Sequence, residues 1–168
     1  RLTSSRRWVK MNFSHLSPEL LQRLPKSYQI QVAEALSTLQ KRQQKKACEE
    51  SLADFVKAAW HVIEPGQPYT HGWHIDAIAM HLEAVTDGDI NRLLINVPPG
   101  TMKSLLTNVF WPAWEWGPRN MPHLRYVCTA HSQNLAVRDS TKMRRLIQSD
   151  WYQGHWCKQV ELTGDQNA

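Results

Sequence analysis

The fold prediction starts from the stretch Arg92-Leu-Leu-Ile-Asn-Val-Pro-Pro-Gly-Thr-Met-Lys-Ser-Leu-Leu106. Its first part, Leu93 to Val97, is rich in leucine and β-branched residues, which predicts a buried strand. Pro98-Pro99-Gly100 ends that strand, and the apolar run after Lys103-Ser104 predicts a helix. A strand, a turn, Lys-Ser and a helix follow one another in this order in a phosphate-binding P-loop.

Each part of such a loop has a physical task. The backbone N–H groups and the start of the helix attract phosphate oxygens, the lysine reaches the β- and γ-phosphates, and the serine hydroxyl ligates Mg²⁺. The general pattern G-x-x-x-x-G-K-[ST] would place glycines at positions 97 and 102, where this chain has Val97 and Met102. On the pattern alone, an ordinary strand–turn–helix connection with a surface lysine therefore remains an alternative.

The rest of the chain extends this prediction. Leu124 to Ala130 predicts a second strand and Asn134 to Gln148 a second helix, so the order in this half is β-α-β-α. That order favours a parallel sheet with right-handed crossovers. We therefore expect an α/β fold with an incomplete P-loop NTPase-type parallel sheet in residues 65–168. An α-helical N-terminal segment, residues 1–64, precedes it, with helices expected from Ser17 and at 26–46 and 52–64, followed by one at 73–85.

Composition limits the classes of function. The chain has 168 residues, of which 42% are hydrophobic and 21% charged, so it can form a packed core. A net charge of +5 permits contact with nucleic acid, and Lys41 to Lys46 is strongly basic, but a solvated helix end explains that run as well. The cysteines lack metal-site spacing, and His71 and His74 lack a third ligand at a convincing spacing. No apolar run approaches the ~20 residues that a membrane span requires.

Four segments taken together point to one family. They are Phe55-Val-Lys-Ala-Ala-Trp60 with Tyr69-Thr-His-Gly-Trp-His-Ile-Asp76, the stretch Asn91 to Leu105, Trp111-Pro-Ala-Trp-Glu-Trp-Gly-Pro118, and Tyr126-Val-Cys-Thr-Ala-His-Ser132 with the residues after it. In these segments, over roughly residues 52–168, the chain resembles the large subunit of tailed-phage terminases. That subunit is the ATPase that drives DNA into the capsid.

The resemblance implies a role for particular residues. Lys103 would be the catalytic lysine on the phosphates, and Ser104 would ligate Mg²⁺. Tyr69, Trp73 and His74 are the candidates for holding the adenine, with core packing as the alternative for the two larger aromatic rings. Ser132 and Arg138 would lie on the nucleotide side of the sheet, with a surface salt bridge as the alternative for Arg138. The implied nucleotide-binding loop consists of Pro98, Pro99, Gly100, Thr101, Met102, Lys103, Ser104 and Leu105.

The resemblance also implies elements that are not found in these residues. An acidic Walker B strand should follow the second strand, and a nuclease domain should follow that; Val160 to Asp165 is the nearest candidate for the strand and fits poorly. We therefore expect the N-terminal part of a terminase large subunit, ending inside its ATPase domain. It would bind ATP weakly and would not hydrolyse ATP or cleave DNA alone. An uncovered sheet edge would make it marginally stable and prone to aggregation.

The expected partners follow from the same resemblance. They are double-stranded DNA, the small terminase subunit and the portal protein, in the cytoplasm of a bacterial host, with homo-oligomers formed only by the full-length protein. Two other interpretations stay open. One is a different P-loop ATPase, such as a helicase-like protein, and the other is a non-catalytic DNA- or partner-binding module built on the basic helical segment 12–64.

Overall fold

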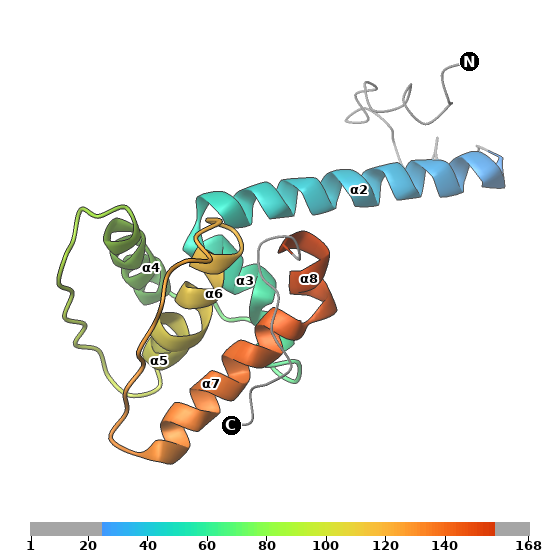
Figure 1. The fold of residues 1–168 in the computed structure, drawn as a ribbon. Helices are drawn as coiled ribbons and strands as arrows, with labels where there is room; N and C mark the ends of the chain where they lie inside the picture. Colours follow the sequence, from blue (N-terminus) through green and yellow to red (C-terminus); the bar gives the residue numbers. More distant parts are fainter. Residues whose placement is uncertain (1–24, 157–168) are drawn as a thin grey trace. The chain divides into compact units, whose positions relative to one another are not determined.

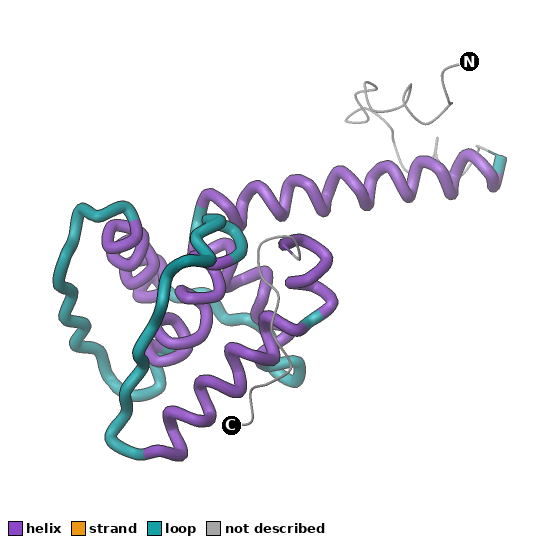
Figure 2. Tube along the Cα trace, in the orientation of Figure 1, coloured by secondary structure: helices purple, strands orange, loops and turns teal. Residues whose placement is uncertain are grey.

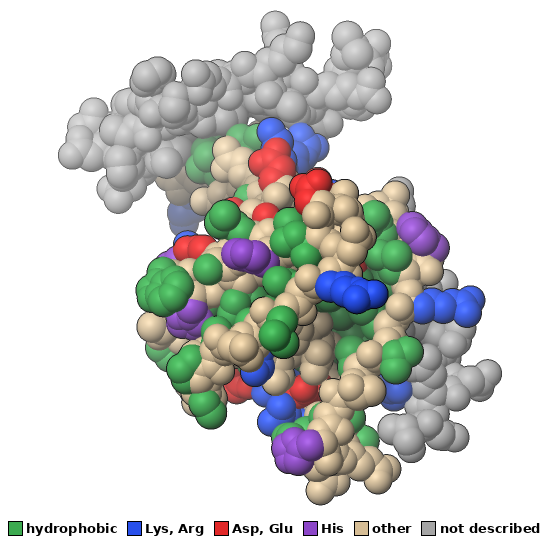
Figure 3. Space-filling model, turned by 90° about the vertical axis from the view of Figure 1, so that its left-hand side faces the viewer, with side chains coloured by type: hydrophobic (Ala, Val, Ile, Leu, Met, Phe, Trp, Pro, Cys, Tyr) green, Lys and Arg blue, Asp and Glu red, His purple; other side chains and the backbone are tan. Residues whose placement is uncertain are grey.

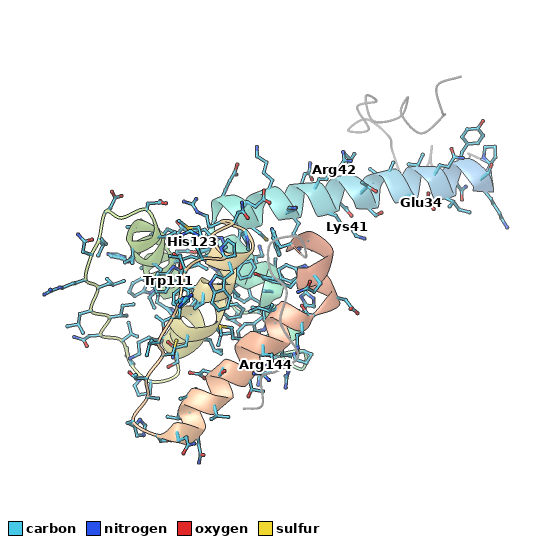
Figure 4. All side chains as sticks on the ribbon, viewed as in Figure 1. Glu34, Lys41, Arg42, Trp111, His123 and Arg144 are labelled. Atoms are coloured by element: carbon cyan, nitrogen blue, oxygen red, sulfur yellow. The ribbon has the colours of Figure 1, made fainter. Side chains whose placement is uncertain are left out.

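The computed structural model describes residues 25–156, and the chain forms two compact units, Arg1–Gln44 and Lys45–Ala168. The first described element is α2 (Lys26–Glu50), a helix of 25 residues that begins in the first unit. It confirms the helix predicted at 26–46 and extends it by one turn. Glu34, Lys41 and Arg42 project from it into solvent (Figure 4). The short helix predicted from Ser17 lies outside the described residues.

The second unit is a group of helices joined by extended segments and turns (Figure 1). Its helix α3 follows the N-cap residue Ser51, whose hydroxyl accepts a hydrogen bond from the Asp54 amide at 3.4 Å. The elements after α2 are α3 (Leu52–Ile63), α4 (Trp73–Thr86), α5 (Lys103–Leu105), the π-helical turn η4 (Leu106–Phe110), α6 (Trp111–Trp116), α7 (Gln133–Gln148) and α8 (Asp150–Trp156). The helices predicted at 52–64, 73–85 and 134–148 are therefore confirmed.

The core of the second unit lies where α3, η4 and α6 meet α4, α7 and α8. Large aromatic side chains fill it: the Phe55 ring lies 5.7 Å from the Trp156 ring and 6.4 Å from that of Tyr152. Two polar groups of this core are paired across helices: the Trp114 indole donates to the Cys48 carbonyl at 2.7 Å, and the Tyr152 hydroxyl donates to the Ala113 carbonyl at 2.7 Å. The core thus fixes the helix that follows residue 102 against α7.

The predicted parallel sheet is absent from residues 25–156, and the α/β fold class is therefore wrong for this structure (Figure 2). Both predicted strands, Leu93 to Val97 and Leu124 to Ala130, lack strand pairing, and across the described residues no backbone hydrogen bond joins one segment to the other. A strand exists only through hydrogen bonds to a neighbouring strand, and a local apolar pattern cannot supply that neighbour. The second unit buries its apolar surface between helices instead.

The first of these segments nevertheless keeps the alternation of an extended chain. Leu93, Ile95 and Val97 pack against the helical core, while Leu94 between them is 84% exposed. Trp73 and Val127 are also exposed. Figure 3 looks on to the side of the molecule where α4 and this segment lie, and it shows hydrophobic side chains in several separate places among basic and histidine side chains.

In the described part of the chain, none of the helices combines the length and the apolar character needed to cross a bilayer.

Candidate functional site

The loop between the extended segment and α5 has an unusual backbone. Gly100 has a φ of 85° and Met102 a φ of 61°, both in the left-handed region. The Thr101 hydroxyl donates to the Pro98 carbonyl at 2.8 Å and closes the turn. Glycine adopts a positive φ freely, whereas a residue with a side chain pays roughly 1–2 kcal/mol for it. Position 102, where the general P-loop pattern has glycine, thus has a left-handed backbone that glycine adopts without strain and that methionine adopts here.

This loop lines a cavity of about 530 Å³. Every residue of the predicted phosphate-binding loop, from Pro98 to Leu105, lines it, together with Val97 before them. Helix α7 contributes the remaining residues of the lining, Arg138 and Lys142. The sequence analysis predicted that Arg138 would lie on the nucleotide side, but it gave no indication that Lys142 would lie beside the loop. The fold thus brings the loop and α7 together around one space.

The basic side chains of this cavity differ in their surroundings. Lys103 is exposed, and no ion pair holds it anywhere in residues 25–156. Lys142 forms an ion pair with Glu64 at the end of α3, with 2.5 Å between Nζ and Oε1. Arg138 contacts the neighbouring Asp139. Lys103 is therefore the cation that is most available to an incoming anion.

Asp139 is a buried acid beside this cavity, with only 4% of its surface exposed. Its Oδ1 accepts a hydrogen bond from Nε of Arg138 at 2.9 Å, and Nη2 of the same guanidinium lies 2.7 Å from it in an ion pair. Its Oδ2 accepts a bond from Nδ2 of Asn108, in η4, at 3.3 Å. Sequence reasoning gave Asp139 no role, although its spacing from Met143 and Leu146 places it on the apolar face of α7. An acid on such a face requires partners because an unpaired buried charge is costly.

The adenine candidates lie apart from this lining. Tyr69, Trp73 and His74 are not among the residues around the cavity. Tyr69 packs edge-on against Trp60 with ring centres 5.8 Å apart, and burial, with Asp76 and Asp54 nearby, raises its pKa. Trp73 is 81% exposed at the start of α4, with His74 beside it. The packing of Tyr69 matches the core alternative, and an adenine-binding role for the three residues stays a prediction.

Ser104 is the predicted Mg²⁺ ligand, and it is exposed in the cavity lining at the second residue of α5. Residues 25–156 contain no group of three or more His, Cys, Asp or Glu side chains arranged to hold a metal ion. Mg²⁺ in nucleotide sites keeps several waters and is held by one or two protein oxygens together with phosphate oxygens. A single exposed hydroxyl fits that arrangement.

Ser132, the N-cap of α7, makes no capping hydrogen bond through its side chain and does not line the cavity.

The chain was compared with known proteins at three levels. No family model, no curated protein and no solved structure matches it. The functional conclusion therefore depends on the residues and the geometry of the cavity.

Proposed function

We propose that this chain binds the triphosphate of ATP, together with Mg²⁺, in the cavity formed by residues 97–105 and α7. The observation that carries the proposal is the cavity itself. It joins the loop bearing Lys103 and Ser104 to two further basic residues on a separate helix, Arg138 and Lys142. A compact site with several cations suits a compact polyanion better than it suits a neutral ligand.

In this proposal each polar group of the loop binds a particular part of the Mg·ATP ligand. The ammonium of Lys103 binds the β- and γ-phosphates, and the hydroxyl of Ser104 is a ligand of Mg²⁺. The first N–H groups of the helical run that begins at Lys103 have no partner within the helix, so they are additional donors for phosphate oxygens. The Mg²⁺ ion, when bound, neutralises part of the phosphate charge. None of these tasks requires a parallel sheet.

The sequence resemblance supplies the wider context of the proposal. The chain would be the ATP-binding part of a phage terminase large subunit, acting in the cytoplasm of an infected or lysogenic bacterium. Double-stranded DNA, the small terminase subunit and the portal protein would be its partners in the complete motor. We expect binding without hydrolysis, because none of the described residues that line the cavity is an acid that could orient an attacking water.

DNA binding through the basic end of α2 has weaker support. Lys45 and Lys46 lie 3.8 Å and 3.6 Å from Glu49 and Glu50, one helical turn further on. These pairs place a negative charge beside each of the two lysines, and exposed pairs of this kind are typical of an ordinary solvated helix. We therefore favour the nucleotide site over a DNA-binding α2.

Equilibrium binding of a fluorescent ATP analogue with Mg²⁺ tests the proposed function. Lys103→Ala is expected to weaken binding by about 10- to 100-fold, the effect of removing one charge-assisted hydrogen bond. Lys57→Ala is the matched control, because Lys57 is an exposed lysine on α3 that does not line the cavity. Its affinity should equal that of the unmodified chain. Equal affinities for all three proteins, or equal losses in both variants, would refute a phosphate site at Lys103; circular dichroism verifies that each variant is helical.

A further inference from the structure

Arg138 is held more firmly than an exposed arginine usually is. Half of its side chain is exposed, but the Asp139 side chain that it contacts is buried and accepts a hydrogen bond from Asn108 at its other oxygen. Two of the three guanidinium nitrogens, Nε and Nη2, contact Asp139 Oδ1. A guanidinium has five N–H donors in a rigid fork, so this contact leaves donors, those of Nη1 among them, for another acceptor. Arg138 is thus anchored by Asp139, and it lines the cavity.

The anchor also connects Arg138 to the loop. Asn108 lies in η4, and the hydroxyl of Thr107 beside it donates to the Lys103 carbonyl at 3.0 Å. Asp139 therefore ties α7 to the helical run that Lys103 begins. This tie fixes Arg138 relative to Lys103, and a fixed pair of cations can select a ligand by the spacing of its charges.

From this geometry we infer that Arg138, positioned by Asp139, binds the terminal phosphate and makes the cavity prefer a nucleoside triphosphate to a diphosphate. The inference rests on the proposed function and adds the ligand class that the site selects. Lys103 provides affinity for both nucleotides, because it contacts the β-phosphate, which both of them have. Arg138 approaches from α7 and contacts the additional phosphate that only the triphosphate has. Asp139 acts only through Arg138 and is a positioning residue.

The experiment measures the dissociation constants of Mg·ATP and Mg·ADP by competition against the fluorescent analogue. Arg138→Gln is expected to weaken ATP binding about tenfold and ADP binding less than about twofold, because one charge-assisted contact to the third phosphate is lost. Asp139→Asn keeps the shape of the Asp139 side chain and removes its charge. Like Arg138→Gln, it should lower the ratio of the ATP affinity to the ADP affinity. Arg145→Gln is the control, since Arg145 is an exposed arginine of α7 that does not line this cavity.

The affinity ratio separates the possible outcomes, because a general loss of structure weakens both nucleotides equally. A selective loss of ATP affinity in Arg138→Gln supports the inference. An unchanged ratio overturns it and leaves Arg138 as a partner of Asp139 alone. If ATP binding requires Lys103 and does not depend on Arg138, only this inference fails and the proposed function stands. If the unmodified chain binds neither nucleotide, the proposed function fails as well.

Discussion

Replacing Trp114 by alanine is expected to lower the free energy of unfolding by about 3–5 kcal/mol, the range for truncating a large buried aromatic side chain. Trp114 is 1% exposed in the middle of α6. Its indole N–H donates to the carbonyl of Cys48, in the last turn of α2, where backbone carbonyls have no partner within the helix. The substitution would therefore leave both a cavity and an unpaired buried carbonyl, and each of these destabilises the fold.

Urea unfolding followed by circular dichroism measures this effect. Trp73→Ala is the matched control: it removes the same side chain at a site that is 81% exposed, and its free energy of unfolding should change by less than about 0.5 kcal/mol. If Trp114→Ala is too unstable to purify, Trp114→Phe removes the indole N–H with a smaller loss of volume, and it should still lower the unfolding midpoint. Equal stability of the position-114 and position-73 variants would contradict the described core.

Gly117→Ala is expected to lower the free energy of unfolding by about 2–3 kcal/mol through overpacking. A Cβ at this position would overlap the Tyr152 hydroxyl and would lie 2.8 Å from Cζ of the same ring and 3.2 Å from Cβ of Trp156. Tyr152 is fully buried, and its hydroxyl is bound to the Ala113 carbonyl. The ring therefore cannot move aside without losing that hydrogen bond.

Gly66→Ala is the control for this substitution. Nothing lies within 4 Å of a Cβ at Gly66, and its backbone is not in the left-handed region. Alanine there should be neutral or stabilising by up to about 1 kcal/mol, because it restricts the unfolded chain. Tyr152→Phe removes the atom that the new methyl group overlaps, so Gly117→Ala should cost less in that background than alone. Additive effects in thermal or urea unfolding would count against the described contact between α6 and α8.

The sequence predicted the helices well because their signals are local. In α3, Leu52, Phe55 and Ala59 stand at helical spacing, and all three are completely buried. Ser51 and Pro65 stand immediately outside the segment predicted to be helical. A proline inside an apolar run usually ends a helix, but Pro112 lies in the first turn of α6, and the helical run begun at Lys103 continues through it. The π-helical turn η4 precedes it, and a proline in the first turn of a helix removes no essential hydrogen bond.

The sheet was predicted wrongly because pairing is not a local property. Leu93 to Val97 has the alternating burial of a strand, yet a strand needs a neighbour that the local pattern does not encode. The loop residues predicted from their pattern line one cavity, and their role in binding a nucleotide stays a prediction. The positions of Lys142 and Asp139 near the loop were not predicted, since they depend on how α7 packs against η4. Helix α8 was missed as well; it is short, and buried aromatic side chains hold it in place.

Hydrogen–deuterium exchange with and without Mg·ATP tests the central claim most directly, because it locates the ligand as well as detecting it. We predict slower exchange in peptides covering residues 97–106 and 135–143, with no change in α2 between residues 26 and 44. AMP, which lacks the β- and γ-phosphates, should leave the loop unprotected. A folded chain whose loop exchanges at the same rate with and without saturating Mg·ATP would contradict the account, as would protection confined to other segments.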